Sequence, residues 1–173
     1  LADTTSTTSI GFVAAASPLT LDLVPSFNFG TGHAVPASDT VYTMTGTDAS
    51  SVQVTDNRGL TALRAWTVTE QLGKFSPDSG VTTSLTGATL SLTAGISRQV
   101  GGLGVAVPVA SPLIAMASGG SPVNVVTTVN VLSITGGVFQ ASWQPEVIKL
   151  SVLGGTASVG THVATINWTL STD

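Results

Sequence analysis

The chain has 173 residues, of which 42% are apolar and only 8% are charged, and its net charge is −4. An intrinsically disordered chain is excluded, because disorder requires low hydrophobicity and high net charge. Nucleic-acid binding is excluded as well, since five Lys and Arg residues cannot form the basic surface that phosphate neutralisation needs. The same shortage disfavours electrostatic binding to anionic membranes or wall polyanions. The absence of cysteine excludes thiolate metal sites, cysteine catalysis and disulfides.

The composition favours an all-β fold in a single domain of ordinary size. Thr, Ser, Gly and Val take the place of the missing charges. Thr and Val suit the half-buried surface of a strand, and Gly and Ser suit turns. We therefore predict an antiparallel β-sandwich or a barrel-like Greek key without substantial helix.

In chain order, the polar residues 1–9 are predicted to form a flexible lead to a single domain over residues 10–173. Ile10 and Phe12 are expected to begin the first strand. Apolar residues alternate from Leu19 to Leu23, which is the period of a half-buried strand. The alternation continues at Phe27 and Phe29 and ends at the following glycines.

A second strand is predicted around Val52 and Val54. Residues 56–59 favour a turn, because Asp and Asn bond the local backbone and Gly accepts a positive φ. Leu63 to Leu72 is predicted as the return strand, and Leu90 to Leu92 as another short one.

Residues 95–122 are rich in Gly and Pro and are predicted to be loops with at most one hairpin. The apolar stretch 103–117 is interrupted and is shorter than the roughly 20 residues of a membrane helix, so no membrane span is predicted. Strands are then expected within 123–134, 139–143, 148–152 and 164–170.

No catalytic or metal-binding motif stands out. The two histidines, His33 and His162, are not part of a nucleophile elbow or a zinc-protease motif, and no EF-hand spacing occurs. We therefore predict neither enzyme activity nor a cofactor or metal. A glycan hydrolase stays open as an alternative if Glu70 or Glu146 pairs with an aspartate across a cleft.

Trp66 and Trp168 are the candidate binding residues, because an indole face can stack on a sugar ring or anchor a partner protein. Trp168 shares its predicted strand face with Ile166, so a core position is an open alternative. Trp66 shares its face with Arg64 and Glu70 and is expected to be the more exposed indole.

Three stretches stand out in chain order: 19–30 with its Phe29-Gly30 pair, 54–59 followed by Trp66-Thr67-Val68, and 162–171 with Trp168-Thr169-Leu170. Together they span roughly residues 10–173, and they resemble the motifs of the WxL domain of Gram-positive cell-surface proteins. The chain departs from the family in three places: Val68 stands where Leu is usual, His162 stands near the position of the usual Tyr, and the insert between Gly59 and Trp66 is slightly long. Residues 95–122 match nothing in the family pattern.

The resemblance implies a secreted, non-catalytic module that is held non-covalently at the cell wall. Its expected partners are peptidoglycan or another wall glycan, a membrane-anchored partner surface protein and, in some members, a host matrix protein. The residues predicted to contact the ligand or partner are Trp66, Thr67, Val68, Trp168, Thr169 and Leu170.

One alternative is a structural assembly or host-matrix adhesion module without glycan affinity. Such a module pairs through an exposed strand edge. The segments that could supply this edge are 123–134 and 95–122.

Overall fold

The protein is an all-β structure, as the composition predicts. Every strand pair is antiparallel. The one helical element among the described residues is a single 3-10 turn at Pro145–Val147. The predicted lead, residues 1–9, lies outside the described part of the chain. The computed structural model describes residues 10–11, 19–58, 65–77, 85–101, 108–128 and 137–172.

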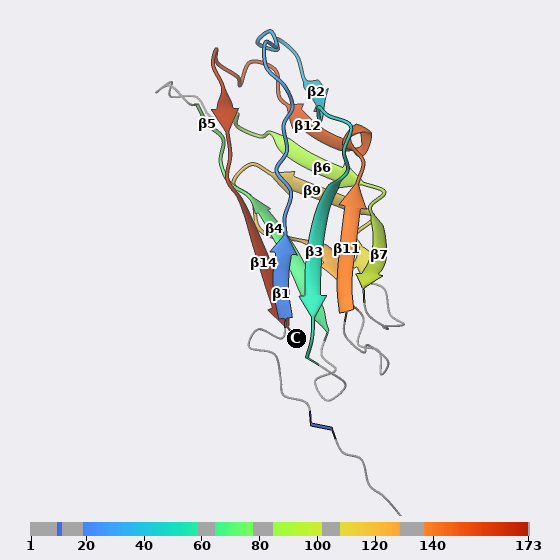
Figure 1. Cartoon of the computed structure of the whole chain (residues 1–173). Helices are drawn as coiled ribbons and strands as arrows, with labels where there is room; N and C mark the ends of the chain where they lie inside the picture. The colour runs from blue at the N-terminus through green and yellow to red at the C-terminus, as the bar shows by residue number, and fades with distance from the viewer. Residues whose placement is uncertain are drawn as a thin grey trace, which may run out of the picture.

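The strands form three four-stranded sheets and one two-stranded ribbon (Figure 1). Sheet A has the order β1 (Leu19–Leu23), β3 (Ser50–Asp56), β11 (Gly137–Trp143), β7 (Ile96–Gly101). Sheet B has the order β2 (Thr40–Thr43), β12 (Ile148–Val152), β6 (Thr89–Thr93), β9 (Leu113–Ala117). Sheet C has the order β14 (Ile166–Thr172), β4 (Trp66–Leu72), β10 (Val123–Thr127), β8 (Val109–Ala110), and the ribbon pairs β5 (Ser76–Pro77) with β13 (His162–Val163).

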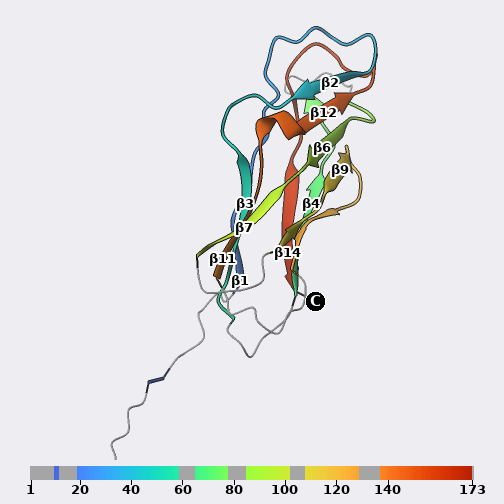
Figure 2. The same cartoon turned by 90° about the vertical axis from the view of Figure 1, so that its right-hand side faces the viewer.

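Sheets A and C form the two layers of a sandwich. Figure 2 shows β1, β3 and β11 on one side and β4 and β14 on the other, with β2 and β12 of sheet B at the end away from the C-terminus. A sandwich of this kind buries the inward face of each strand and leaves the other face in solvent.

Strict alternation along the strands builds the core. The strands β3, β4 and β11 each bury every second residue over their whole length. Trp66 of β4 and Phe139 of β11 meet between the layers, with ring centroids 6.0 Å apart. The period of two therefore places one face of each strand in the core, as the sequence predicts.

Several sequence predictions are wrong. β4 does not return alongside β3, because β3 joins sheet A and β4 joins sheet C. Residues 95–122 contain β7, β8 and β9 rather than mainly loops. Phe27 and Phe29 are half-buried but lie outside any strand, as does Ile10. The strand β2 has no counterpart among the predicted elements.

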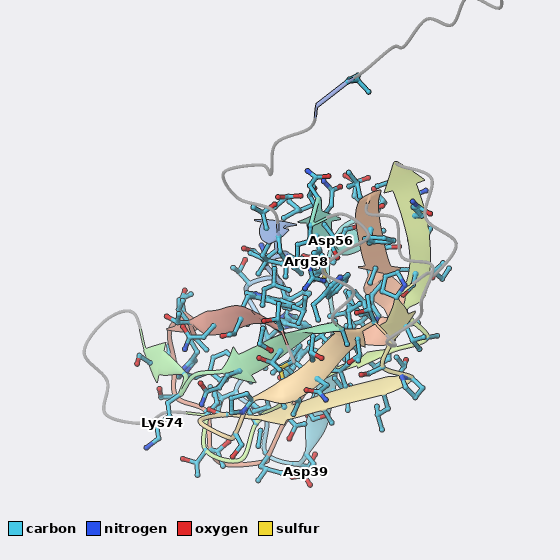
Figure 3. The ribbon with its side chains drawn as sticks, turned by 90° about the horizontal axis from the view of Figure 1, so that it is seen from below. Asp39, Asp56, Arg58 and Lys74 are labelled. Atoms are coloured by element: carbon cyan, nitrogen blue, oxygen red, sulfur yellow. The ribbon has the colours of Figure 1, made fainter. Side chains whose placement is uncertain are left out.

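The chain at the end of β3 is held by a largely buried ion pair between Asp56 and Arg58 (Figure 3). The Arg58 guanidinium donates from Nη2 to Asp56 Oδ2 at 2.8 Å and from Nε to Asp56 Oδ1 at 2.9 Å. The Arg58 backbone N–H donates to Asp56 Oδ1 at 3.2 Å. Because the geometry is bidentate and both side chains are largely buried, the pair fixes how the chain leaves β3.

Within the described ranges, no helix is long and apolar enough to cross a membrane.

Gly95 tests the packing around the buried indole of Trp143. A Cβ atom added there would lie 2.4 Å from Nε1 of the buried Trp143. We expect Gly95→Ala to lower the free energy of unfolding by about 1–3 kcal/mol in urea denaturation, because the indole must be displaced. Gly101→Ala is the matched control, since its Cβ would sit at an ordinary 3.6 Å from Val138. Equal stability of the two variants would contradict this packing.

Candidate functional site

The two tryptophan motifs lie side by side on β4 and β14. In the register of this antiparallel pair, Leu170 is opposite Val68, Trp168 is opposite Glu70, and Thr172 is opposite Trp66. The third residues of the two motifs are therefore direct cross-strand partners, with one indole on either side of them. The sequence resemblance brings together two stretches that tertiary structure makes neighbours.

Trp66 is not exposed, contrary to the sequence prediction. Its side chain has no exposed area, and neither have those of Val68 and Glu70. The backbone of Trp66 is clamped by the buried Thr128: Trp66 N–H donates to Thr128 Oγ1 at 2.8 Å, and Thr128 N–H donates to Trp66 O at 3.0 Å. The prediction failed because Glu70, which was read as a sign of a polar face, is itself buried.

The remaining predicted contact residues divide between two faces of sheet C. Trp168 and Leu170 are half-buried and pack against the core. Thr67 and Thr169 point to the opposite face, where Thr169 is exposed. The structure brings all six residues onto one strand pair, yet not onto one surface, and their role in binding stays a prediction.

Glu70 is a buried carboxyl without a partner. Neither of its carboxyl oxygens accepts or donates a hydrogen bond among the described residues, and the indole nitrogens of Trp66 and Trp143 are also buried without a partner. Burial raises the pKa of Glu70 from 4.5 to about 8. The carboxyl is therefore mostly protonated at neutral pH, because desolvation penalises its charged form.

A groove of about 820 Å³ opens at the end of the molecule near sheet B. Its volume lies in the range of pockets that hold small ligands. Two stretches, 27–36 and 157–164, supply most of its lining. The rest comes from β2, β4, β6, β12 and β14 and from Phe75 and Leu85, which lie outside the strands. In Figure 1 these elements meet at the end opposite the C-terminus.

The stretch 27–36 is held in place by backbone bonds at both ends. The Asn28 carbonyl accepts from Thr45 N–H at 2.8 Å, and the Pro36 carbonyl accepts from Gly155 N–H at 3.0 Å. Between these points, His33 Nε2 donates to the Phe29 carbonyl at 2.8 Å. The groove wall is thus fixed by the chain around it even though it belongs to no sheet.

Ring side chains line the groove. The rings of His33 and Tyr42 lie 4.6 Å apart between centroids, tilted by 52°. Phe27, Phe29 and Phe75 also face this space, and His162 contributes a further ring. Such a surface can stack on a flat apolar ligand face, while the imidazoles offer polar atoms.

The groove has no ionisable carboxylate, ammonium or guanidinium in its described lining. Glu70 lies between the sheets, and the exposed Glu146 belongs to the 3-10 turn, so neither carboxyl that the hydrolase alternative requires faces the groove. Among the described residues, no cluster of three metal-ligating side chains occurs. The arrangement can bind a neutral ligand.

The sequence did not point to the groove. Tyr42 was missed because β2 was not predicted, although Thr40–Thr43 consists of residues that favour strands. His33 and His162 were considered only as catalysts. The two histidines lie beside apolar residues because of how the stretches 27–36 and 157–164 run. Hydrophobic periodicity does not predict the course of such stretches.

These features define a small all-β domain with a ring-lined groove that carries no carboxylate, ammonium or guanidinium among its described lining residues. The family model described as "WxL domain surface cell wall-binding" matches residues 4–173. The chain therefore belongs to the WxL family and is a wall-associated domain of the cell surface. No match was found among curated proteins or among solved structures.

Trp66→Ala is expected to destabilise the fold severely, by about 3–5 kcal/mol in urea denaturation, because it leaves a large cavity between the sheets. Thr169→Ala on the outer face of the neighbouring strand is the control and should change stability by less than about 0.5 kcal/mol. A Trp66→Ala protein with the stability of the parent chain would contradict the buried position of the indole.

Glu70 makes stability depend on pH. Its folded pKa of about 8 exceeds the unfolded value of 4.5. The buried carboxyl therefore costs no ionisation penalty below pH 4.5, and stability is lost as the pH rises from 4.5 to 8. The loss amounts to several kcal/mol, about 1.4 per pH unit. We expect Glu70→Gln to flatten the fall in melting temperature between pH 5 and pH 8. Parallel curves for the two proteins would show that Glu70 does not titrate in this way.

Proposed function

We propose that the domain attaches its protein non-covalently to the cell wall by binding the glycan of peptidoglycan in the groove. The observation that carries the proposal is the groove itself: it is ring-lined and uncharged in a domain whose family binds the wall. Sugars present apolar C–H faces that suit aromatic rings. On this proposal the domain is secreted and acts by adhesion without catalysis.

The charge of the chain supports a neutral wall ligand. Five Lys and Arg residues stand against nine Asp and Glu, and none of either kind lines the groove. Anionic wall polymers would find no cation there to neutralise them. Attachment should therefore be nearly insensitive to salt, since no exposed charge pair contributes to it.

A membrane-anchored or host protein is the second candidate partner, and strand edges favour it. The edge strand β7 exposes Ile96 by 62% and Val100 by 44%, and the edge strand β9 exposes Leu113 by 62%. An edge with exposed apolar side chains is a template for strand addition. The segment 123–134 does not offer such an edge in its described part, because β10 lies between β4 and β8.

Recovery of the purified chain on isolated wall sacculi tests the glycan proposal. We expect Val163→Asp to lower the bound fraction about tenfold, because it places an uncompensated charge in an apolar groove. Val41→Asp is a close match as a control: Val163 is 56% exposed and lines the groove, whereas Val41 is 57% exposed and does not. Binding of the parent chain should hold between about 0.05 M and about 0.5 M NaCl.

Two further results of this experiment would contradict the proposal. Equal recovery of the Val163→Asp and Val41→Asp proteins would remove the groove from the site. Loss of binding in a Thr67→Ala, Thr169→Ala double variant, with the Val163→Asp protein still bound, would move the site to the outer face of sheet C.

A further inference from the structure

We propose that the groove selects an N-acetylated sugar and that His162 is the residue that reads its acetamido group. The inference rests on the proposed function and names the part of the wall glycan that the groove recognises. It follows from the hydrogen-bonding state of His162 and from the absence of charge around it.

The hydrogen bonds of His162 determine which ring nitrogen carries its proton. Nε2 lies 3.0 Å from the backbone carbonyl of Ser158, and a carbonyl oxygen can only accept. Nε2 must therefore donate, which leaves Nδ1 of the neutral imidazole as an acceptor. This atom is buried and has no hydrogen-bond partner among the described residues.

An unpartnered buried acceptor is costly, by about 1–3 kcal/mol. A ligand that donates a hydrogen bond to Nδ1 would recover this free energy. To reach the buried atom it must displace part of the stretch 157–164, in which Val159 and Val163 are exposed. The stretch contains Gly160, whose φ is +130°, a conformation that glycine adopts without strain. The unpartnered Nδ1 therefore favours a ligand that carries a hydrogen-bond donor.

The surroundings of the imidazole restrict the chemistry of that donor. Apolar side chains flank His162 in the groove lining, among them Val159, Val163 and Ile166, and no charged side chain is present to pair with an ammonium or a phosphate. The donor must therefore be neutral and must be accompanied by apolar surface. An acetamido group combines a neutral N–H with a methyl group.

The ring pair on the opposite stretch completes the fit to a sugar. His33 is held against Tyr42 by its bond to the Phe29 carbonyl, so the pair is pre-organised for contact with a flat ligand face. A sugar ring can contact one of these ring faces, and His162 lines the same groove, where an acetamido substituent would meet it. A glucan without the acetamido group keeps the ring contact and loses the donor and the methyl.

Two oligosaccharides that differ in the acetamido group test the inference. N-acetylchitotetraose and cellotetraose share the β-1,4-linked backbone and carry no charge. Titration of the full chain should give at least about tenfold tighter binding of N-acetylchitotetraose, since a site that bonds a donor rejects the analogue without it. The ¹⁵N resonance of His162 Nδ1 should move on binding of N-acetylchitotetraose alone.

Variants of His162 separate recognition from folding. His162→Phe keeps a ring and removes the acceptor, and it should bring the two affinities to within about threefold of each other. His162→Asn restores an acceptor at the position of Nδ1 and should recover part of the preference. The melting temperature of each variant shows that it is folded, and Val41→Asp serves again as the control.

Each outcome decides between the inference and the proposed function. Equal binding of the two oligosaccharides overturns the inference and leaves attachment to the wall intact. Binding to sacculi without binding to either oligosaccharide, or competition by stem peptides alone, overturns the inference as well. A chain that does not bind sacculi overturns the proposed function and the inference together.

Discussion

The antiparallel pairing of β4 with β14 is the constraint on which the rest of the structure depends. It places Leu170 opposite Val68 at the centre of the pair. The side chains of both residues therefore point to the same face of sheet C, which is the face that packs on sheet A. An antiparallel pair has a local two-fold axis, so two similar motifs can meet around one point. The indole of Trp66 then fills the space between the layers, and the half-buried indole of Trp168 covers their margin. Trp66 and Trp168 thus contribute to packing between the two layers.

The same pairing positions the groove. Leu72 and Ile166 are the next cross-strand pair on the same face of β4 and β14 beyond Glu70 and Trp168, and both line the groove. The strand pair therefore forms the base of the groove, and β2, β13 and the stretch 27–36 supply the ring side chains of Tyr42, His162 and His33. A variant that loosens the core would disturb binding indirectly. Tests of the groove accordingly rely on exposed residues, whose replacement leaves the layers intact.

The small number of charged residues affects both the stability of the domain and the chemistry of its groove. With few charged side chains available, the core keeps one carboxyl, Glu70, in its protonated form, and the groove offers rings and imidazoles in place of ions. The largely buried ion pair of Asp56 and Arg58 is the exception, and it holds the chain at the end of β3. A groove of this kind suits a neutral ligand, which is what the proposed function requires.

The sequence by itself determined the all-β class, seven of the strands to within a few residues and the family. It could do so because alternation with a period of two and turn-forming residues are local properties of the chain. Only the tertiary structure decided which strands pair: β3 and β4 follow one another yet belong to opposite layers. It also decided that Trp66 and Glu70 are buried, since a strand face reveals its burial only when a second layer covers it. The groove was out of reach for the same reason, because His33, Tyr42 and His162 come together through loops whose course depends on contacts between distant parts of the chain.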